Sequence, residues 1–240
     1  MLLAKSKSPL AKSKKSRIPK KTNKKTRKNV NPSEKAIQPE ISSTVVFCHN
    51  GLCVKKSTHG MGTFATKRIP TNTILLREKP HALDEPRSSE YVFKLIRRLL
   101  DDPATKPQLE SLVPLSIDPS DEHRIAPYSD LEEGHRKYLP DLTPEQMRLM
   151  HAKLMRNWFS LGDRPGILFT GTRMNHSCDP NVRYSMDGDH MVFRTARPIR
   201  KNEEIFDSYI NGKLPYAERQ EELQRRYGFQ CGCDKCFKRM

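Results

Sequence analysis

The sequence predicts an α+β fold in which small β-sheets flank a helical insert. Three observations support this prediction. Short strand-like segments occur in the first and last thirds of the globular part, and a stretch with helical periodicity separates them. The regular strand–helix–strand alternation that a parallel sheet requires is missing. A charged helix and a cysteine-rich tail follow the last strand-like segment.

The N-terminal segment 1–40 differs in composition from the rest of the chain. It contains thirteen Lys or Arg and two acidic residues, whereas residues 41–240 contain 31 basic and 26 acidic residues. So few large apolar residues cannot bury enough surface to offset the chain entropy, and we expect a disordered basic tail. Such a tail is typical of a nuclear import signal or an arm that contacts nucleic acid. The alternative is a tail that only increases solubility.

Two classes of protein are excluded by the distribution of apolar residues. No apolar run approaches the about 18–20 residues of a membrane helix. At the N-terminus, Lys5 interrupts the chain before any secretory apolar stretch forms. We expect no membrane contact, and the Lys-rich tail leads us to expect a nuclear protein, with a cytoplasmic location as the alternative. In these compartments six cysteines favour metal ligands or free thiols over disulfides.

The first half of the globular part begins with strands and continues with helices. Segments of alternating or apolar residues bounded by Gly, Pro, Asn and Thr predict strands over 45–48, 63–69 and 73–79. Apolar residues spaced by four then predict an amphipathic helix over 89–101. This helix belongs to a Pro-rich, mostly polar insert that spans 84–142.

The second half begins with a well-marked helix start at Thr143. Thr at the N-cap, Pro at the first helical position and Gln at the third favour a capped helix. Apolar alternation on both sides of Asp187-Gly188 predicts a hairpin that starts at Val182. A strand over 203–209 and a final charged helix over 216–227 complete the expected elements.

Three cysteines near the C-terminus, Cys231, Cys233 and Cys236, form the strongest chemical signal. Structural zinc takes four thiolate or imidazole ligands in a tetrahedron, so a fourth ligand must come from elsewhere. Cys178 is our candidate, and Cys48 or a histidine would serve the same chemistry. The alternative is reduced thiols without a metal. We expect Cys48 and Cys53 to be packed thiols, although two nearby histidines leave a second metal site open.

The segment Gly60-Met61-Gly62 does not fit a dinucleotide-binding loop. That loop needs a third glycine and a following helix, whereas a strand is predicted here. Two spaced glycines offer bare backbone that a ligand can approach closely. The alternative is an ordinary tight turn.

Taken together and in order, these pieces resemble the SET-domain protein-lysine methyltransferases, and most of all the SET-and-MYND branch and fungal SET proteins. The resemblance covers 45–83 and 144–240. The motifs that carry it are Gly60-Met61-Gly62, Asn175-His176-Ser177-Cys178, Glu203-Glu204-Ile205 with Tyr209, and the tail pattern Tyr227-x-Phe229-x-Cys231-x-Cys233-x-x-Cys236.

The resemblance implies a SET fold of small sheets over 41–230, with a pseudoknot, and a zinc-binding post-SET segment over 231–240. The sequence departs from the SET-and-MYND pattern in three ways. No cysteine occurs in 70–150, so a MYND finger is not expected. The chain ends four residues after Cys236, so the C-terminal helical domain is not expected either. A glycine common before the acidic pair is replaced by Asn202.

The resemblance also implies a role for each matching residue. Tyr209 would be the catalytic tyrosine, and Tyr227 would form the second aromatic wall of a lysine channel. The residues implied to bind S-adenosylmethionine are His59, Gly60, Met61, Asn157, Asn175, His176, Tyr209 and Phe229. The implied zinc ligands are Cys178, Cys231, Cys233 and Cys236.

The implied activity is S-adenosylmethionine-dependent methylation of lysines in histones or other proteins, by a monomer. The alternative is a catalytically silent SET module that binds lysine peptides or chromatin. The complete set of donor-binding residues favours the enzyme, because a pure binding module does not need them. A third hypothesis, a zinc-stabilised protein that binds nucleic acid, rests only on the basic tail.

Overall fold

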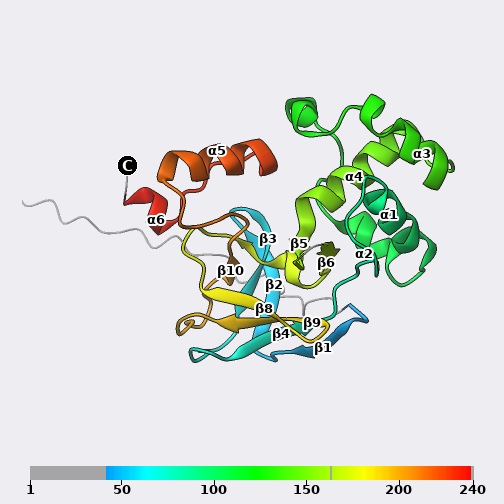
Figure 1. Ribbon diagram of the computed structural model, residues 1–240. Helices are drawn as coiled ribbons and strands as arrows, with labels where there is room; N and C mark the ends of the chain where they lie inside the picture. Colours follow the sequence, from blue (N-terminus) through cyan, green and yellow to red (C-terminus); the bar gives the residue numbers. More distant parts are fainter. Residues whose placement is uncertain (1–41, 163, 239–240) are drawn as a thin grey trace, which may run out of the picture. The chain divides into compact units, whose positions relative to one another are not determined.

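The computed structural model describes residues 42–162 and 164–238 (Figure 1). The predicted basic tail, residues 1–40, lies outside the described residues, as do the last two residues of the expected post-SET segment. The described chain is mixed helix and strand, with small sheets formed before and after a group of helices. The predicted α+β class is therefore confirmed.

A four-stranded antiparallel sheet joins the two ends of the globular part. Its strands are β1 (Val45–Cys48), β4 (Ile74–Glu78), β9 (His190–Thr195) and β8 (Val182–Asp187), in that spatial order. Strand β4 pairs with β9, so that Glu78 lies opposite Met191. Leu75, Leu76 and Phe193 from these strands are buried in one hydrophobic cluster. The predicted strands over 45–48 and 73–79 are present, the second shortened to Ile74–Glu78.

The second sheet is a hairpin of β2 (Leu52–Ser57) and β3 (Gly60–Ala65). The sequence predicted a strand over 63–69, but the observed strand ends at Ala65 because its partner β2 begins at Leu52. Strand β2 was not predicted, since two of its residues are lysines and its apolar alternation is short. Beyond β3, Ile69 forms an isolated bridge with Ile199.

The hairpin of β8 and β9 is present as predicted, with its turn displaced by one residue. Asp187 pairs with His190, so the turn consists of Gly188 and Asp189 rather than Asp187 and Gly188. Gly188 has a φ of 62°, which a primed two-residue turn requires and glycine adopts without strain.

The insert over 84–142 is helical, as predicted. It contains α1 (Tyr91–Asp101), α2 (Lys106–Ser111), α3 (Glu132–Tyr138) and 3₁₀ turns at Pro119–Arg124 and Tyr128–Asp130. In Figure 1 these helices lie together, beside α4 (Pro144–Asn157). They share a hydrophobic cluster with α4, so the insert has a core of its own.

Helix α4 connects this cluster to the short strands of the site. Its start is the predicted capping box: the Gln146 N–H donates to Thr143 Oγ1 at 3.2 Å, and the Thr143 N–H donates to Gln146 Oε1 at 2.8 Å. The helix ends at Asn157 and continues into β5 (Trp158–Ser160), which pairs with β6 (Pro165–Ile167).

The last part of the chain contains short strands and two helices. The predicted strand over 203–209 is reduced to β10 (Phe206–Asp207), which pairs in parallel with β7 (Asn175–His176). The preceding acids turn the chain instead, because the Glu203 side chain accepts the Arg200 N–H at 2.9 Å. Helix α5 (Tyr216–Tyr227) has the predicted bounds, and α6 (Asp234–Phe237) follows it.

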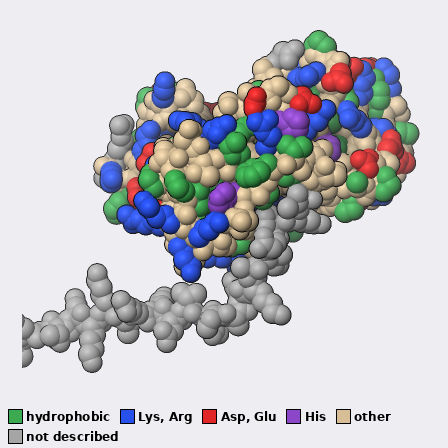
Figure 2. Space-filling view, turned by 90° about the horizontal axis from the view of Figure 1, so that it is seen from below, with side chains coloured by type: hydrophobic (Ala, Val, Ile, Leu, Met, Phe, Trp, Pro, Cys, Tyr) green, Lys and Arg blue, Asp and Glu red, His purple; other side chains and the backbone are tan. Residues whose placement is uncertain are grey.

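The surface of the described part carries charges of both signs. Figure 2 shows Lys and Arg side chains interspersed with acidic and hydrophobic ones on the face in view. This mixture agrees with the nearly balanced composition of residues 41–240. Among the helices described, none has the length and apolar character needed to cross a membrane.

One buried carboxylate, Glu78 at the end of β4, fixes the loop that leads to the site. Its oxygens accept the N–H groups of Thr170 and Gly171 at 3.0 and 2.9 Å. Glu78 is fully buried, and this burial raises its pKa to about 7. The two bonds hold the start of the 3₁₀ helix Gly171–Arg173, which runs directly into β7.

We predict that Glu78→Ala lowers the free energy of unfolding by about 2–4 kcal/mol, because two buried N–H groups lose their acceptor. Glu78→Gln keeps one acceptor oxygen and loses less. Because the folded-state pKa is raised, the contribution of Glu78 is complete below pH 4.5 and declines as the pH rises to about 7. Urea unfolding at pH 4.5 and pH 8 measures both effects. Exposed Glu221→Ala is the control, and equal stability of all three variants would contradict the prediction.

Candidate functional site

The site forms where two short segments, 31 residues apart in the chain, pair in parallel. Asn175 lies opposite Phe206, and His176 lies opposite Asp207. The Ser177 N–H donates to the Asp207 carbonyl at 2.8 Å and extends this pairing by one bond. The pair brings the Asn-His-Ser-Cys motif next to the segment that ends in Tyr209.

His176 connects the two segments through both of its ring nitrogens. Nδ1 accepts the Tyr209 backbone N–H at 3.0 Å, and Nε2 lies 3.4 Å from the Cys178 sulfur. Burial, together with the charges of Arg219 and His59, lowers the pKa of His176 to about 4. The ring is therefore neutral at pH 7, and its proton is on Nε2, directed at Cys178.

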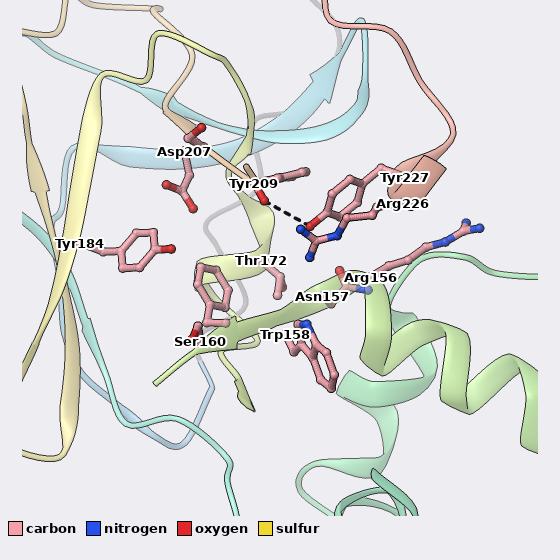
Figure 3. Close-up of a pocket in the computed structure, with 12 residues that line it drawn as sticks. Arg156, Asn157, Trp158, Ser160, Thr172, Tyr184, Asp207, Tyr209, Arg226 and Tyr227 are labelled. Carbon is pink, nitrogen blue, oxygen red and sulfur yellow. Dashed lines mark hydrogen bonds between the residues drawn. The ribbon is translucent and has the colours of Figure 1, made fainter. Parts of the chain in front are cut away.

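Four aromatic rings form a continuous wall around this point. His176 lies 5.2 Å from the Tyr209 ring and 5.9 Å from the Phe229 ring, measured between centroids. Tyr227 closes the set, at 5.1 Å from Tyr209 and 6.3 Å from Phe229. In Figure 3, the dashed line joins the Tyr227 hydroxyl to the Tyr209 carbonyl, a contact of 3.4 Å.

The Tyr209 hydroxyl is oriented by a backbone carbonyl. It donates to the Met174 carbonyl at 2.9 Å, which leaves the oxygen lone pairs free to accept. Burial raises the pKa of Tyr209, and the nearby Asp207, Tyr227 and Glu204 raise it further. The phenol therefore keeps its proton at neutral pH and does not act as a general base.

Two cavities meet at this aromatic wall. The larger has a volume of about 760 Å³ and the smaller, shown in Figure 3, about 210 Å³. Five residues line both cavities, namely Arg156, Asn157, Thr172, Tyr209 and Tyr227. The two cavities thus adjoin at residues that include the two tyrosines.

The larger cavity contains every residue that the sequence implied for binding the methyl donor. These are His59, Gly60, Met61, Asn157, Asn175, His176, Tyr209 and Phe229. They come from the turn between β2 and β3, β3, α4, β7, the segment after β10 and the segment after α5, and the fold brings them together. Their predicted roles toward the donor are taken up below as a proposal.

In both asparagines of the larger cavity, the Nδ2 group donates its hydrogen bonds within the protein and not to the cavity. Asn175 Nδ2 donates to Glu204 Oε1 at 2.7 Å and to the Met61 carbonyl at 3.3 Å. Asn157 Nδ2 donates to the carbonyls of Val113 and Lys153 at 2.6 and 2.8 Å. Within the described residues neither Oδ1 has a hydrogen-bond partner, so this acceptor atom is left for a ligand.

Gly62 has a different role from the one that its sequence context indicated. We expected bare backbone for a ligand, but a Cβ at this position would lie 2.3 Å from Glu204 Oε1 and 2.7 Å from Asn175 Nδ2. Gly62 therefore makes room for the hydrogen bond between Glu204 and Asn175. Gly60, with a φ of 96°, lines the larger cavity and fits the original expectation better.

Sequence analysis gave no role to two acids that the fold places at the site, although Glu204 belongs to a motif that carries the resemblance. Glu204 receives hydrogen bonds from Asn175 and from Ser57, at 2.7 and 2.9 Å. Asp207 is buried and lines the smaller cavity. For Asp207 a signal was available in the sequence. This acid directly follows the apolar pair Ile205-Phe206, at a position where a strand normally buries an apolar side chain.

The four cysteines implied as zinc ligands come together in the structure. The sulfur atoms of Cys178, Cys231, Cys233 and Cys236 all lie within 4.8 Å of one another. Zinc–sulfur bonds of about 2.3 Å in a tetrahedron place the sulfurs about 3.8 Å apart, so this set fits structural zinc. A bound ion would join β7 to the segment around α6.

The surroundings of the cysteines also fit a metal centre. Burial raises the pKa of the Cys178 thiol, so a cation must offset the cost of its thiolate. Buried Arg219 lies beside the cluster, with Nη2 at 3.5 Å from the Cys236 sulfur and Nη1 donating to the Leu214 carbonyl. Helix α5 is thereby anchored to the cysteines.

Cys48 and Cys53 are separate from this cluster. Cys53 is buried and Cys48 half-buried, and burial raises the pKa of both thiols. Over the part of the chain that is described, neither belongs to a group of three or more candidate metal ligands. This agrees with the expectation of packed thiols.

Comparison with known proteins shows which family the chain resembles. The sequence profile described as "SET domain" matches residues 60–210. "Putative SET domain-containing protein L678" of Acanthamoeba polyphaga mimivirus is 30% identical over 74% of this chain and 74% of its own length. "Histone-lysine N-methyltransferase set5" of Schizosaccharomyces pombe is 28% identical over 74% of this chain, which spans only 47% of that protein.

A solved structure shows the same fold. The protein described as "Crystal structure of the SET domain of LSMT bound to Lysine and AdoHcy" superposes with a TM-score of 0.56 and 13% identity. The match covers 78% of this chain and 54% of that one. At this identity the likeness concerns the fold.

We predict that the protein binds one zinc ion and that Cys178→Ser or Cys233→Ser loses it, because three thiolates leave the tetrahedron open. Metal analysis by mass spectrometry of the dialysed protein measures the zinc content. Cys53→Ser is the matched control, a buried thiol outside the cluster, and should retain the ion. Full zinc content in both cluster variants would show that the ligand assignment is wrong.

Proposed function

Since this chain belongs to the SET domain family, we propose that it is a protein-lysine N-methyltransferase that uses S-adenosylmethionine as the methyl donor. The names of its relatives support this proposal, because several are called histone-lysine N-methyltransferases. The structural neighbour bound to lysine and AdoHcy supports it further. We propose histones or other lysine-bearing proteins as substrates.

The observation that carries the proposal is the meeting of two unequal cavities at Tyr209 and Tyr227. Pockets for nucleoside-sized ligands measure about 300–1,000 Å³, a range that suits the larger cavity as the donor site. The smaller cavity has room for an extended lysine side chain. A methyl group can then pass between the two sites along the aromatic wall.

We infer the donor contacts from the atoms that remain free in the larger cavity. Asn175 Oδ1 is the acceptor for the donor's ammonium group, since its Nδ2 is held by Glu204 and Met61. The backbone of 59–61 lines the same cavity and faces the methionine part. Phe229 offers a ring face to the adenine. The cysteine cluster, two residues further on, holds Phe229 in place.

S-adenosylmethionine supplies a methyl group on a positively charged sulfur. Tyr209 donates its own proton to Met174, so its lone pairs point away from that bond and can accept contacts from the polarised methyl. A lysine with a pKa of about 10.4 must lose a proton before it attacks, at a cost of about 4–5 kcal/mol at pH 7. The aromatic wall disfavours the ammonium by desolvation and aligns the amine.

We also propose a nuclear location. The support comes from relatives named for histone methylation and from the Lys-rich composition of residues 1–40. Contact of this tail with nucleic acid and a monomeric state stay predictions.

The first test is calorimetric titration of S-adenosylmethionine into the full, zinc-loaded chain. We expect Asn175→Ala to bind at least about tenfold more weakly, because a hydrogen bond to a charged group contributes about 1.5–3 kcal/mol. Asn50→Ala, at an exposed surface position, is the control and should bind like the wild type. A folded, zinc-loaded protein that does not bind the donor would contradict the proposal and favour the silent module that binds lysine peptides.

The second test concerns the tyrosine. Tyr209→Phe keeps the ring but loses the hydroxyl, and we expect methyl transfer to fall by about 10²–10³, as for other oriented groups at a reacting centre. Transfer of tritiated methyl to core histones measures the rate, and calorimetry should show donor affinity close to that of the wild type. Tyr138→Phe, which removes a hydroxyl bonded to Glu90 in the insert, is the control. A wild-type rate would remove Tyr209 from the mechanism.

A further inference from the structure

The smaller cavity contains a buried carboxylate. Among the described residues that line it, Asp207 is the only acid, and its side chain comes from β10. Asp207 is 5% exposed. Figure 3 shows its carboxylate directed into the space between the rings of Tyr184 and Tyr209. The acid therefore faces the place that the proposed function gives to the substrate lysine.

The backbone holds Asp207 in this position. Its carbonyl accepts the Ser177 N–H at 2.8 Å, and it pairs with His176 in the parallel strands. The pairing with β7 fixes the face of the strand on which each side chain lies. The backbone of β10 therefore directs the carboxylate into the cavity.

Asp207 has no cationic partner in the part of the chain that the structure describes. Its carboxylate accepts the Ser208 N–H, and burial raises its pKa to about 7. A buried carboxylate without a cation is costly, so proteins retain one where a ligand or a reaction uses its charge. An ammonium group that enters the cavity is the partner of fitting charge and size.

The other groups that face this cavity do not take over the role of Asp207. The tyrosines stay protonated near neutral pH, because burial raises their pKa and the charge of Asp207 does so too. Arg226 is paired with Glu222 at 3.0 Å. The titratable and charged side chains that line the cavity with Asp207 are Tyr184 from β8, Tyr209, Tyr227 and Arg226 from α5, and Arg156 from α4.

We propose that Asp207 binds the ammonium group of the substrate lysine in the smaller cavity and accepts its proton before methyl transfer. This inference rests on the proposed function. It names the acceptor that the transfer needs, because Tyr209 retains its own proton and donates it to Met174.

The proposed step is balanced. One N–H bond of the ammonium breaks and an O–H bond forms on the Asp207 carboxylate, which turns an ion pair into a neutral pair. Desolvation inside the closed cavity favours the neutral pair. The amine lone pair then forms the N–C bond to the methyl group as the C–S bond of the donor breaks, and the sulfur keeps that electron pair. The product nitrogen carries the positive charge, and the proton on Asp207 leaves to solvent when the cavity opens.

The binding test uses n-butylammonium as a probe of the lysine side chain and n-butanol as its uncharged counterpart. We expect the wild type to bind butylammonium at least tenfold more tightly than butanol at pH 8, as measured by protein NMR titration. In Asp207→Asn this preference disappears. Asp84→Asn removes one exposed charge, with a side chain 98% exposed, and should behave like the wild type.

These outcomes separate the inference from the proposed function. The probe requires neither donor nor protein substrate, so failure to bind S-adenosylmethionine overturns the function without touching this result. Asp207 does not line the larger cavity, and Asp207→Asn should therefore keep its donor affinity and zinc content. Equal affinity of the wild type for butylammonium and butanol overturns the inference even if Asp207→Asn fails to fold. Equal butylammonium affinity of wild type and Asp207→Asn overturns it as well.

A pH profile tests the proton transfer. In single-turnover transfer to core histones, Asp207→Asn depends on amine that has lost its proton in solution. We expect its rate to rise about tenfold per pH unit between pH 7 and 9. The wild-type rate should rise less steeply, so that the difference between the two proteins narrows toward pH 9. Parallel profiles would overturn the role of Asp207 as the proton acceptor.

Discussion

The site depends on one neutral imidazole. His176 can accept the Tyr209 N–H and donate to Cys178 at the same time only because its ring carries a single proton. Burial lowers its pKa to about 4, so this state persists through the neutral range. A protonated ring would have no acceptor for Tyr209. The orientation of Tyr209 is in this way tied to the cysteine cluster, although their chemical roles differ.

This coupling explains how a two-residue strand pair can carry so many functional groups. A pair as short as β7 and β10 has too few hydrogen bonds to be stable alone. It is held from outside by side-chain hydrogen bonds: buried Glu78 fixes the loop before β7, and half-buried Glu204 joins Asn175 to β2 through Ser57. The larger clusters, in the four-stranded sheet and in the insert with α4, supply the burial. The site therefore lies between well-packed units and is ordered by polar bonds to them.

Sequence analysis succeeded where the signal is local and failed where it depends on burial. The capping box at Thr143 and the bounds of α5 were both predicted, because each depends on residues that are close to one another in the sequence. Three closely spaced cysteines predicted a zinc site, and the family resemblance supplied Cys178 as the fourth ligand. Strand β2 was missed because its lysines hide the alternation, and the role of Gly62 was misjudged because Glu204 contacts it from 142 residues away. Asp207 is an ordinary acid in the sequence, and only its burial beside Tyr209 gives it a chemical role.

Charge explains why the lysine needs a proton acceptor in its own cavity. A sulfonium in the larger cavity and an ammonium in the smaller one would repel each other by about 4 kcal/mol at 4 Å and an effective dielectric constant of about 20. Removing the lysine proton thus does more than free a lone pair, because it also removes this repulsion at the moment of contact. The carboxylate that we propose to take the proton lies in the smaller cavity, at the place proposed for the lysine. The placement of Asp207 on the lysine side thus offsets the ammonium charge on binding, and the proton transfer removes that charge before the methyl group moves.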